Sequence, residues 1–214
     1  DTGNLTRAEV GWEDSQSGFL QSLLGRALSP HDVHFVNGAG PLLDTGAAAT
    51  VSSGLEEKAR RAGALGAYHR SHAVVVIVDS DNDDDPVTHR LGPILRGIAS
   101  GISDVEDGGS APAAIGGLAR RTIEAWVLAD QQAVEAVAGG RFVGPVPNNP
   151  EGLWGTPGEP SSNHPKQVLR RVFGGQLVGA DYGAVGEKLD PSVVATKCPL
   201  GFGPVLAQLQ DACP

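Results

Sequence analysis

An unbroken run of apolar residues is the feature that most constrains this fold. Residues 73–78 read Ala-Val-Val-Val-Ile-Val, and most of them are β-branched. This composition favours a strand that is buried on both faces, as in a parallel sheet covered by helices. The run ends in a segment that contains the five aspartates Asp79, Asp81, Asp83, Asp84 and Asp85. The sequence therefore predicts a buried parallel strand with carboxylates clustered at its carboxyl end.

The acidic segment is a candidate site for a divalent metal ion. In open α/β sheets, ligands bind just beyond the carboxyl ends of the strands. Carboxylates this close together repel one another unless protons or a cation intervene. The alternative is a solvated acidic loop that also caps the next helix, and Pro86 suits the first turn of such a helix.

Strand-like and helix-like patterns alternate along the chain before residue 139. Short apolar segments predict strands at 8–12, 33–36 and 111–118. Apolar residues at helical spacing predict helices at 17–28, 55–68, 87–102 and from 120 onward. We expect an open, mainly parallel α/β sheet flanked by helices.

The domain organisation follows from these patterns and from one long loop. We expect the α/β core in residues 8–138 and a C-terminal helical extension, packed on this core, in residues 164–214. Residues 139–163 between them are rich in Pro, Gly and Asn. A loop of this length inside a compact domain is usually functional or mobile.

Charge and cysteine content limit the classes of partner. The net charge of −9 argues against a large basic surface that holds duplex nucleic acid, although a local, metal-bridged site is compatible with it. Cys198 and Cys213 fit either a disulfide or two reduced thiols. Since no apolar run reaches membrane-spanning length, we expect a cytoplasmic protein without membrane contacts. A homodimer is one oligomeric state that we consider.

Two glutamates lie where a metal site would need them. Glu13 follows the first expected strand, so it occupies the same kind of position as Asp79. Glu124 lies one residue from the apolar face of the helix expected from Arg120, which predicts partial burial at the sheet end. A buried glutamate needs a partner, either Arg120 one turn before it or a metal ion.

Basic and aromatic side chains supply candidate substrate contacts. Lys166 and Arg121 are candidates to bind a substrate phosphate or the transition state. Arg170 belongs with Lys166 to a basic cluster on the helix expected at 164–173. Trp154 lies in the long loop, where it would contact the substrate or cover the site.

Three stretches together resemble a bacterial family of unknown function that is related to Toprim domains. They are Glu-Asp-Ser at 13–15 before Phe-Leu at 19–20, Val-Asp-Ser-Asp at 78–81, and Ile-Glu-Ala-Trp-Val-Leu-Ala-Asp at 123–130 followed by His-Pro-Lys at 164–166. The resemblance implies a Toprim-like fold in which Glu13, Asp79 and Asp81 hold Mg²⁺ for breaking or joining phosphodiester bonds. It also implies that Glu13 acts as a general acid or base. Toprim domains usually place a Gly beside that Glu, whereas Asp14 follows it here.

The leading hypothesis is a Mg²⁺- or Mn²⁺-dependent enzyme that processes phosphodiester bonds, with nuclease-like Toprim chemistry and a role in bacterial defence. Its substrate would be nucleic acid or a phosphorylated small molecule. The expected catalytic residues are Glu13, Asp79, Asp81 and Lys166. The expected metal ligands are Glu13, Asp79, Asp81, Asp83 and Glu124. The expected substrate-binding residues are Arg121, Trp154, Lys166 and Arg170.

Two other function classes fit the same residues. A non-catalytic Toprim-like module that binds metal or nucleotide and regulates a partner would suit the acidic balance of the chain. A phosphatase or phosphotransferase would use Asp79 as its nucleophile, since Asp-x-Asp after a strand also occurs in haloacid-dehalogenase enzymes. Those enzymes usually carry Thr or Val two residues after the second Asp, where this chain has Asp83.

Overall fold

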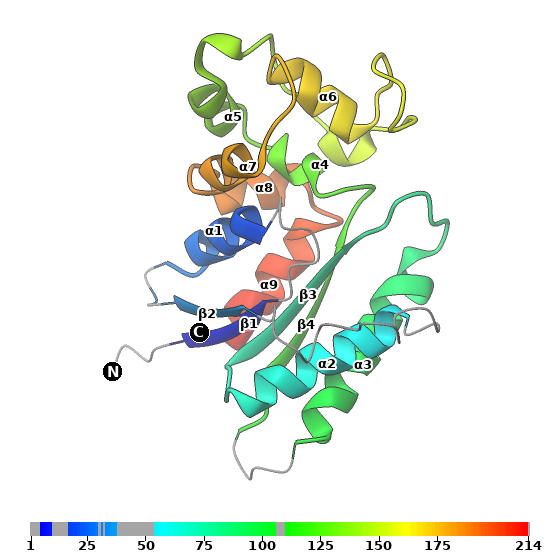
Figure 1. Ribbon diagram of the computed structural model, residues 1–214, viewed down its shortest axis with the longest axis vertical. Coiled ribbons are helices and arrows are strands. Elements are labelled where there is room, and N and C mark those ends of the chain that lie inside the picture. The colour runs from blue at the N-terminus through cyan, green and yellow to red at the C-terminus, as the bar shows by residue number, and fades with distance from the viewer. Residues whose placement is uncertain are drawn as a thin grey trace.

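The protein has a mixed α/β structure, with a parallel sheet, flanking helices and a mostly helical C-terminal half (Figure 1). A computed structural model describes residues 5–9, 17–29, 31, 33–37, 54–105 and 110–213. For the two strands at 5–9 and 33–37 it describes the backbone alone.

Two long neighbouring strands form the best-defined part of the sheet. β3 (Ala73–Asp79) pairs in parallel with β4 (Ala113–Ala119) along its whole length, from Ala73 opposite Ala113 to Asp79 opposite Ala119. β1 (Leu5–Glu9) and β2 (Val33–Asn37) continue the sheet in the order β2-β1-β3-β4, again in parallel. The buried parallel strand predicted at 73–78 is therefore confirmed, and all four carboxyl ends meet at one edge.

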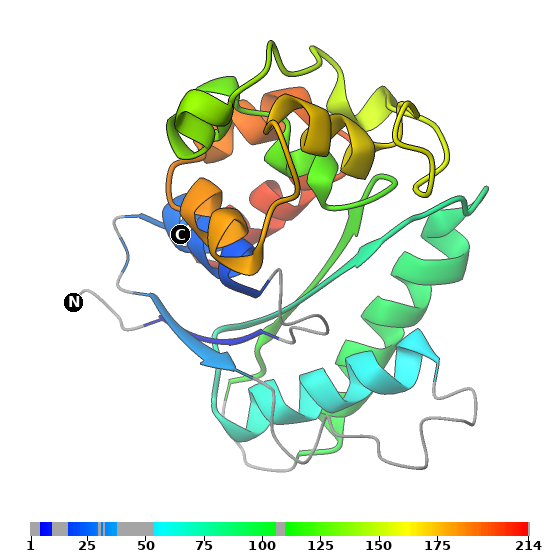
Figure 2. The same ribbon diagram turned by 45° about the horizontal axis from the view of Figure 1, so that its top comes forward.

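Helices α2 (Leu55–Tyr68) and α3 (Gly92–Ser103) cover one face of the sheet (Figure 2). Val74 and Val76 of β3 and Ile94 and Ile98 of α3 are buried in this layer. The two helices pack backbone to backbone, because a side chain at Gly101 would collide with the carbonyl oxygen of Arg60. Before α3, a π-helical turn at Val87–Leu91 follows the acidic segment.

The opposite face carries a larger core that the C-terminal helices share with α1 (Ser17–Ala27). These helices are α4 (Glu124–Val127), α5 (Gln131–Ala138), α6 (Pro165–Val172), α7 (Gly179–Gly186), α8 (Pro191–Lys197) and α9 (Phe202–Ala212). Trp126 packs edge-on against Phe202, with 5.2 Å between ring centroids. Gly117 of β4 leaves the space that Val205 of α9 fills, because a Cβ at Gly117 would lie 2.6 Å from the Val205 side chain.

The helix expected from Arg120 is the main departure from the sequence prediction. It is divided into α4 and α5, and Asp130 lies at the break. The Asp130 carboxylate accepts hydrogen bonds from the backbone N–H groups of Gln132 (3.0 Å) and Ala133 (3.3 Å), so it caps a new helix instead of continuing the old one. Its other oxygen accepts the N–H of Asp190 (3.1 Å), the residue that caps α8.

The segment at 139–163 contains short 3₁₀ turns at Gly139–Arg141 and Pro150–Gly152. Cys198 and Cys213 are both buried, and they do not form a disulfide. No helix in the described part of the chain is long and apolar enough to cross a membrane.

Candidate functional site

The carboxyl ends of β3 and β4 are joined by two residues with unusual backbone conformations. Asp81 has φ of 48° and Arg121 has φ of 67°, in the left-handed region that non-glycine residues rarely adopt. The Asp81 N–H donates to the Arg121 carbonyl (2.9 Å), and the Arg121 guanidinium donates back to the Asp81 carbonyl (2.7 Å). Strained backbone of this kind costs on the order of 1–3 kcal/mol per residue and is concentrated at functional sites.

Asp79 is the last residue of β3, and its side chain faces the C-terminal helices. One carboxylate oxygen accepts the backbone N–H of Ile123 at 2.9 Å. Burial raises the pKa of Asp79 to about 7, and the negative charge of Glu124 adds to this effect. The Ile123 N–H and the Lys166 ammonium act in the opposite direction, but they do not cancel the increase. Without a further cation, Asp79 therefore exchanges its proton near neutral pH.

Glu124 is the charge that acts most strongly on Asp79. It begins α4 and is only 2% exposed. One of its oxygens accepts a hydrogen bond from the Tyr182 hydroxyl of α7 at 3.3 Å. Because α4 begins at Glu124, Arg120 does not lie one helical turn before it. The predicted burial of Glu124 is thus confirmed and is more complete than its position in the sequence suggested.

His164 and Lys166 approach the same acids from the start of α6. His164 is 7% exposed, and its Nδ1 accepts the backbone N–H of Lys166 at 3.3 Å. Burial lowers the pKa of His164, and Lys166 and Arg121 lower it further, while Glu124 and Asp81 act against them. His164 is therefore neutral at neutral pH. Since Nδ1 accepts a hydrogen bond, the proton is on Nε2. Sequence reasoning did not single out His164 as a site residue.

The acidic loop after β3 is held together by a cation of its own, Arg90. The guanidinium donates to the Asp79 carbonyl (2.7 Å) and to the Asp83 carboxylate (3.2 Å), and it pairs with the Asp81 carboxylate (3.2 Å). Asp83 also contacts the His89 ring at 2.9 Å, and these contacts lower the pKa of Asp83. Arg90 thus supplies positive charge at the place where the sequence suggested a metal ion.

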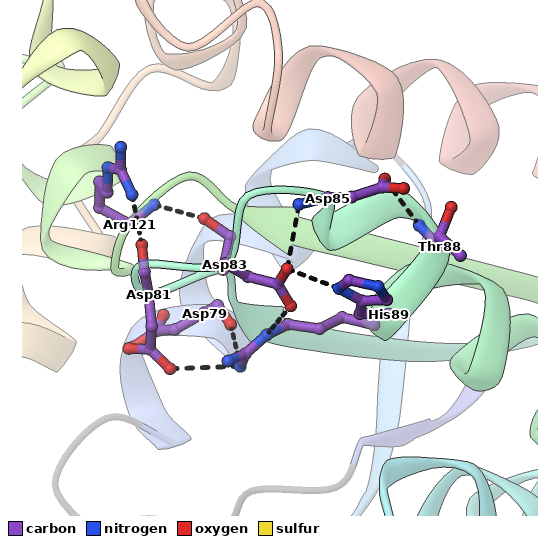
Figure 3. A network of polar contacts seen from close by, with 9 residues as sticks. Asp79, Asp81, Asp83, Asp85, Thr88, His89 and Arg121 are labelled. Carbon is purple, nitrogen blue, oxygen red and sulfur yellow. Dashed lines mark hydrogen bonds and ion pairs between the residues drawn. The ribbon is translucent and has the colours of Figure 1, made fainter.

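Asp85 has the capping role that the alternative interpretation of the acidic segment predicted. Its carboxylate accepts the backbone N–H of Thr88 at 3.2 Å, at the beginning of the π-helical turn (Figure 3). The N–H of Asp85 in turn donates to Asp83 at 3.0 Å. Asp83 and Asp85 therefore organise the loop, whereas Asp79 faces Glu124 on the other side of the strand end.

A cation and an aromatic ring are stacked beside the strand ends. The guanidinium carbon of Arg121 lies 3.4 Å from the centroid of the Trp154 ring, and Trp154 is 55% exposed. Arg170 is exposed on α6, one turn after Lys166. A pocket of about 480 Å³ opens next to Arg121; its lining includes Asp84, Leu118, Arg120 and Leu200.

The structure thus brings several of the expected site residues together at one edge. Asp79, Glu124 and Lys166 interact electrostatically, and Asp81 and Arg121 lie beside them. Glu13, expected as the third metal ligand, lies outside the described residues. Among the residues that the structure describes, no group of three or more Asp, Glu, His or Cys side chains is arranged to hold a metal ion.

A scan against protein-family models, a search of curated proteins and a search of solved structures each gave no match. The resemblance to a Toprim-related family therefore rests on the short sequence motifs alone. A parallel sheet with acids at its carboxyl edge supports many different reactions, so function has to be argued from the residues of the site.

Proposed function

We propose that this protein is a Mg²⁺- or Mn²⁺-dependent enzyme that processes phosphodiester bonds with Toprim-like, nuclease-type chemistry. The observation that carries the proposal is the pair of acids Asp79 and Glu124 at the carboxyl edge of the sheet, where burial and mutual repulsion raise the pKa of Asp79 to about 7. A divalent cation between them would offset this repulsion, because it favours the ionised form of both carboxylates.

The donor set fits a hard cation. Mg²⁺ keeps several waters and usually takes only one or two carboxylates from the protein, with substrate phosphate oxygens as further ligands. Asp79 and Glu124 would supply those carboxylates, and Glu13 is the residue assigned to complete the set. When bound, such an ion polarises a phosphoryl group and activates water for an in-line attack.

The remaining residues would act on the substrate. Lys166 lies close enough to affect the pKa of Asp79, so its ammonium can bind a non-bridging phosphate oxygen beside the acids. Arg121 adds a second cation on the β4 side of the site. His164 carries its proton on Nε2 and interacts electrostatically with Glu124, Lys166 and Asp81, so its N–H can donate a hydrogen bond to an oxygen of the substrate.

Substitution of the two acids tests the proposal. Asp79→Asn and Glu124→Gln should each lower kcat/KM on the order of 100-fold, the effect expected when an electrostatic stabiliser is removed. The assay follows cleavage of labelled single- and double-stranded DNA and RNA while Mg²⁺ or Mn²⁺ is titrated. Asp211→Asn, in an exposed acid of α9, is the matched control and should keep wild-type activity. Equal cleavage by all variants would remove the assignment of the site.

A non-catalytic metal- or nucleotide-binding regulatory module is the second candidate, and the contacts of Arg90 favour it. Arg90 already balances the charges of Asp81 and Asp83, which reduces the need for a second metal ion. Tight Mn²⁺ binding measured by calorimetry, without turnover of any nucleic acid, would support this module over the enzyme. An Asp79 nucleophile is less well supported, because a raised pKa keeps this carboxyl protonated over a wider pH range.

A further inference from the structure

The stacked pair of Arg121 and Trp154 has the properties of a nucleobase-binding surface. The guanidinium covers one face of the indole at 3.4 Å, and yet 55% of the residue is exposed. Much of the residue therefore stays accessible to a ligand. An indole supported in this way is a rigid, flat, apolar surface of the size of a base, and stacking on it does not depend on which base is present.

Basic residues follow β4 and lie on α6, the helix that the loop after Trp154 contacts. Within the described residues, Lys166, Arg170 and Arg120 make no ion pair, and Arg121 donates to a backbone carbonyl. The arginines of α2 and α3 behave differently, because they pair with glutamates of α2. Among the described residues, Arg120, Lys166 and Arg170 are thus available to contact a phosphate backbone.

We propose that the Arg121–Trp154 stack binds a base of single-stranded nucleic acid, so that the substrate of this site is a single strand and not a duplex. As far as cleavage is concerned, this inference rests on the proposed phosphodiester activity. A single strand exposes the faces of its bases to the indole, whereas a duplex keeps them stacked on one another. Duplex binding also needs a broad basic surface, which a chain of net charge −9 is poorly suited to form.

Binding without metal tests the inference separately from catalysis. Fluorescence anisotropy is measured in EDTA at low salt with a short labelled oligonucleotide, as single-stranded DNA, as single-stranded RNA and as the duplex of the same sequence. We expect at least one single strand to bind about tenfold more tightly than the duplex. Trp154→Ala should weaken that binding by about tenfold, and Trp154→Phe by less, because base–aromatic stacking changes affinity on this scale.

Tyr68→Ala is the matched control, since Tyr68 is an exposed aromatic residue at the end of α2, away from the carboxyl edge of the sheet. It should bind like the wild type. Duplex binding as tight as single-strand binding, no single-strand binding at all, or unchanged binding in Trp154→Ala would each overturn the inference. Single-strand binding without cleavage in Mg²⁺ or Mn²⁺ would overturn the enzyme proposal and support the binding surface. Cleavage of single strands and duplexes without preference would support the enzyme proposal and overturn the inference of a single-stranded substrate.

Discussion

Asp79 and Glu124 come from separate elements, the end of β3 and the beginning of α4, and the charge of one raises the pKa of the other. Burial contributes more than Glu124 to this increase, and the N–H of Ile123 partly opposes it. The pair therefore places an electrostatic cost on the native state that a bound cation would remove.

The raised pKa of Asp79 should make the protein less stable as the pH rises through the acid range to neutrality. The unfolded chain releases this proton near pH 3.8 and the folded protein near pH 7, so between these values the folded state binds more protons and stability falls with increasing pH. Asp79→Asn should remove this part of the decline and be about 1–3 kcal/mol more stable than the wild type at pH 8. A change of one pH unit in a pKa corresponds to about 1.4 kcal/mol. The expected gain in stability is set below the full value for this shift because Asp79 is only partly buried. Urea denaturation in EDTA at several pH values measures the unfolding free energy of both proteins. If the two curves of unfolding free energy against pH are parallel, the raised pKa of Asp79 is contradicted.

Divalent metal should stabilise the wild type above pH 7. If Mg²⁺ binds with a Kd about tenfold below its added concentration, the gain is about 1.4 kcal/mol, or a rise in Tm of about 3–5 °C for a chain of this size. Asp79→Asn and Glu124→Gln should lose most of this rise, whereas Asp211→Asn should keep it. Differential scanning calorimetry with and without Mg²⁺ is the measurement. A rise of the same size in all four proteins would indicate that the metal binds elsewhere.

Replacement of Arg90 should separate the stability of the acidic loop from its affinity for metal. Arg90→Gln removes the counter-charge of Asp81 and Asp83 and the hydrogen bond to the Asp79 carbonyl. We expect a loss of about 0.5–1.5 kcal/mol in unfolding free energy, because half-buried acceptors lose their hydrogen-bond donor. Mn²⁺ affinity should increase several-fold, since the carboxylates that Arg90 neutralised become available. Weaker Mn²⁺ binding by calorimetry would show instead that Arg90 arranges these acids for the metal.

Gly101→Ala should strongly destabilise the layer formed by α2 and α3. A methyl group at this position would collide with the backbone of Arg60, and helices that pack backbone to backbone cannot separate without losing other contacts. We expect a loss of about 2–3 kcal/mol. Gly183→Ala in α7 is the control, because a Cβ there has open space, and it should stabilise the protein by about 0.5–1 kcal/mol. Chemical denaturation of both variants provides the comparison.

The sequence predicted those parts of the fold that depend on local patterns. The strand at 73–78 was predicted correctly because a short, β-branched apolar run favours a buried strand. The burial of Glu124 followed from its position beside an apolar helical face. The division of the helix after Arg120 was not predicted. It depends on Asp130, whose carboxylate contacts both its own helix start and the distant Asp190.

The candidate site was predictable only in part, for a similar reason. Asp79 and Lys166 could be named from strand-end position and motif. Arg90 was missed as a partner of the acids because its contacts arise from the way the π-helical turn folds back on the acidic loop. His164 was missed because a histidine next to a proline carries no sign of burial, although its place two residues before Lys166 was a usable signal. The role of Glu13 stays a prediction.

The alternation of side chains along β3 makes the position of the Asp79 carboxylate intolerant of length changes. Ala73, Val75 and Ile77 point to the same side as Asp79, into the larger core, while Val74, Val76 and Val78 point toward α2 and α3. Deleting any single residue of this strand would exchange the two sets and turn the acid toward the wrong helices. Insertions and deletions in a descendant of this chain should therefore be confined to the loops, and β3 should diverge only by substitution.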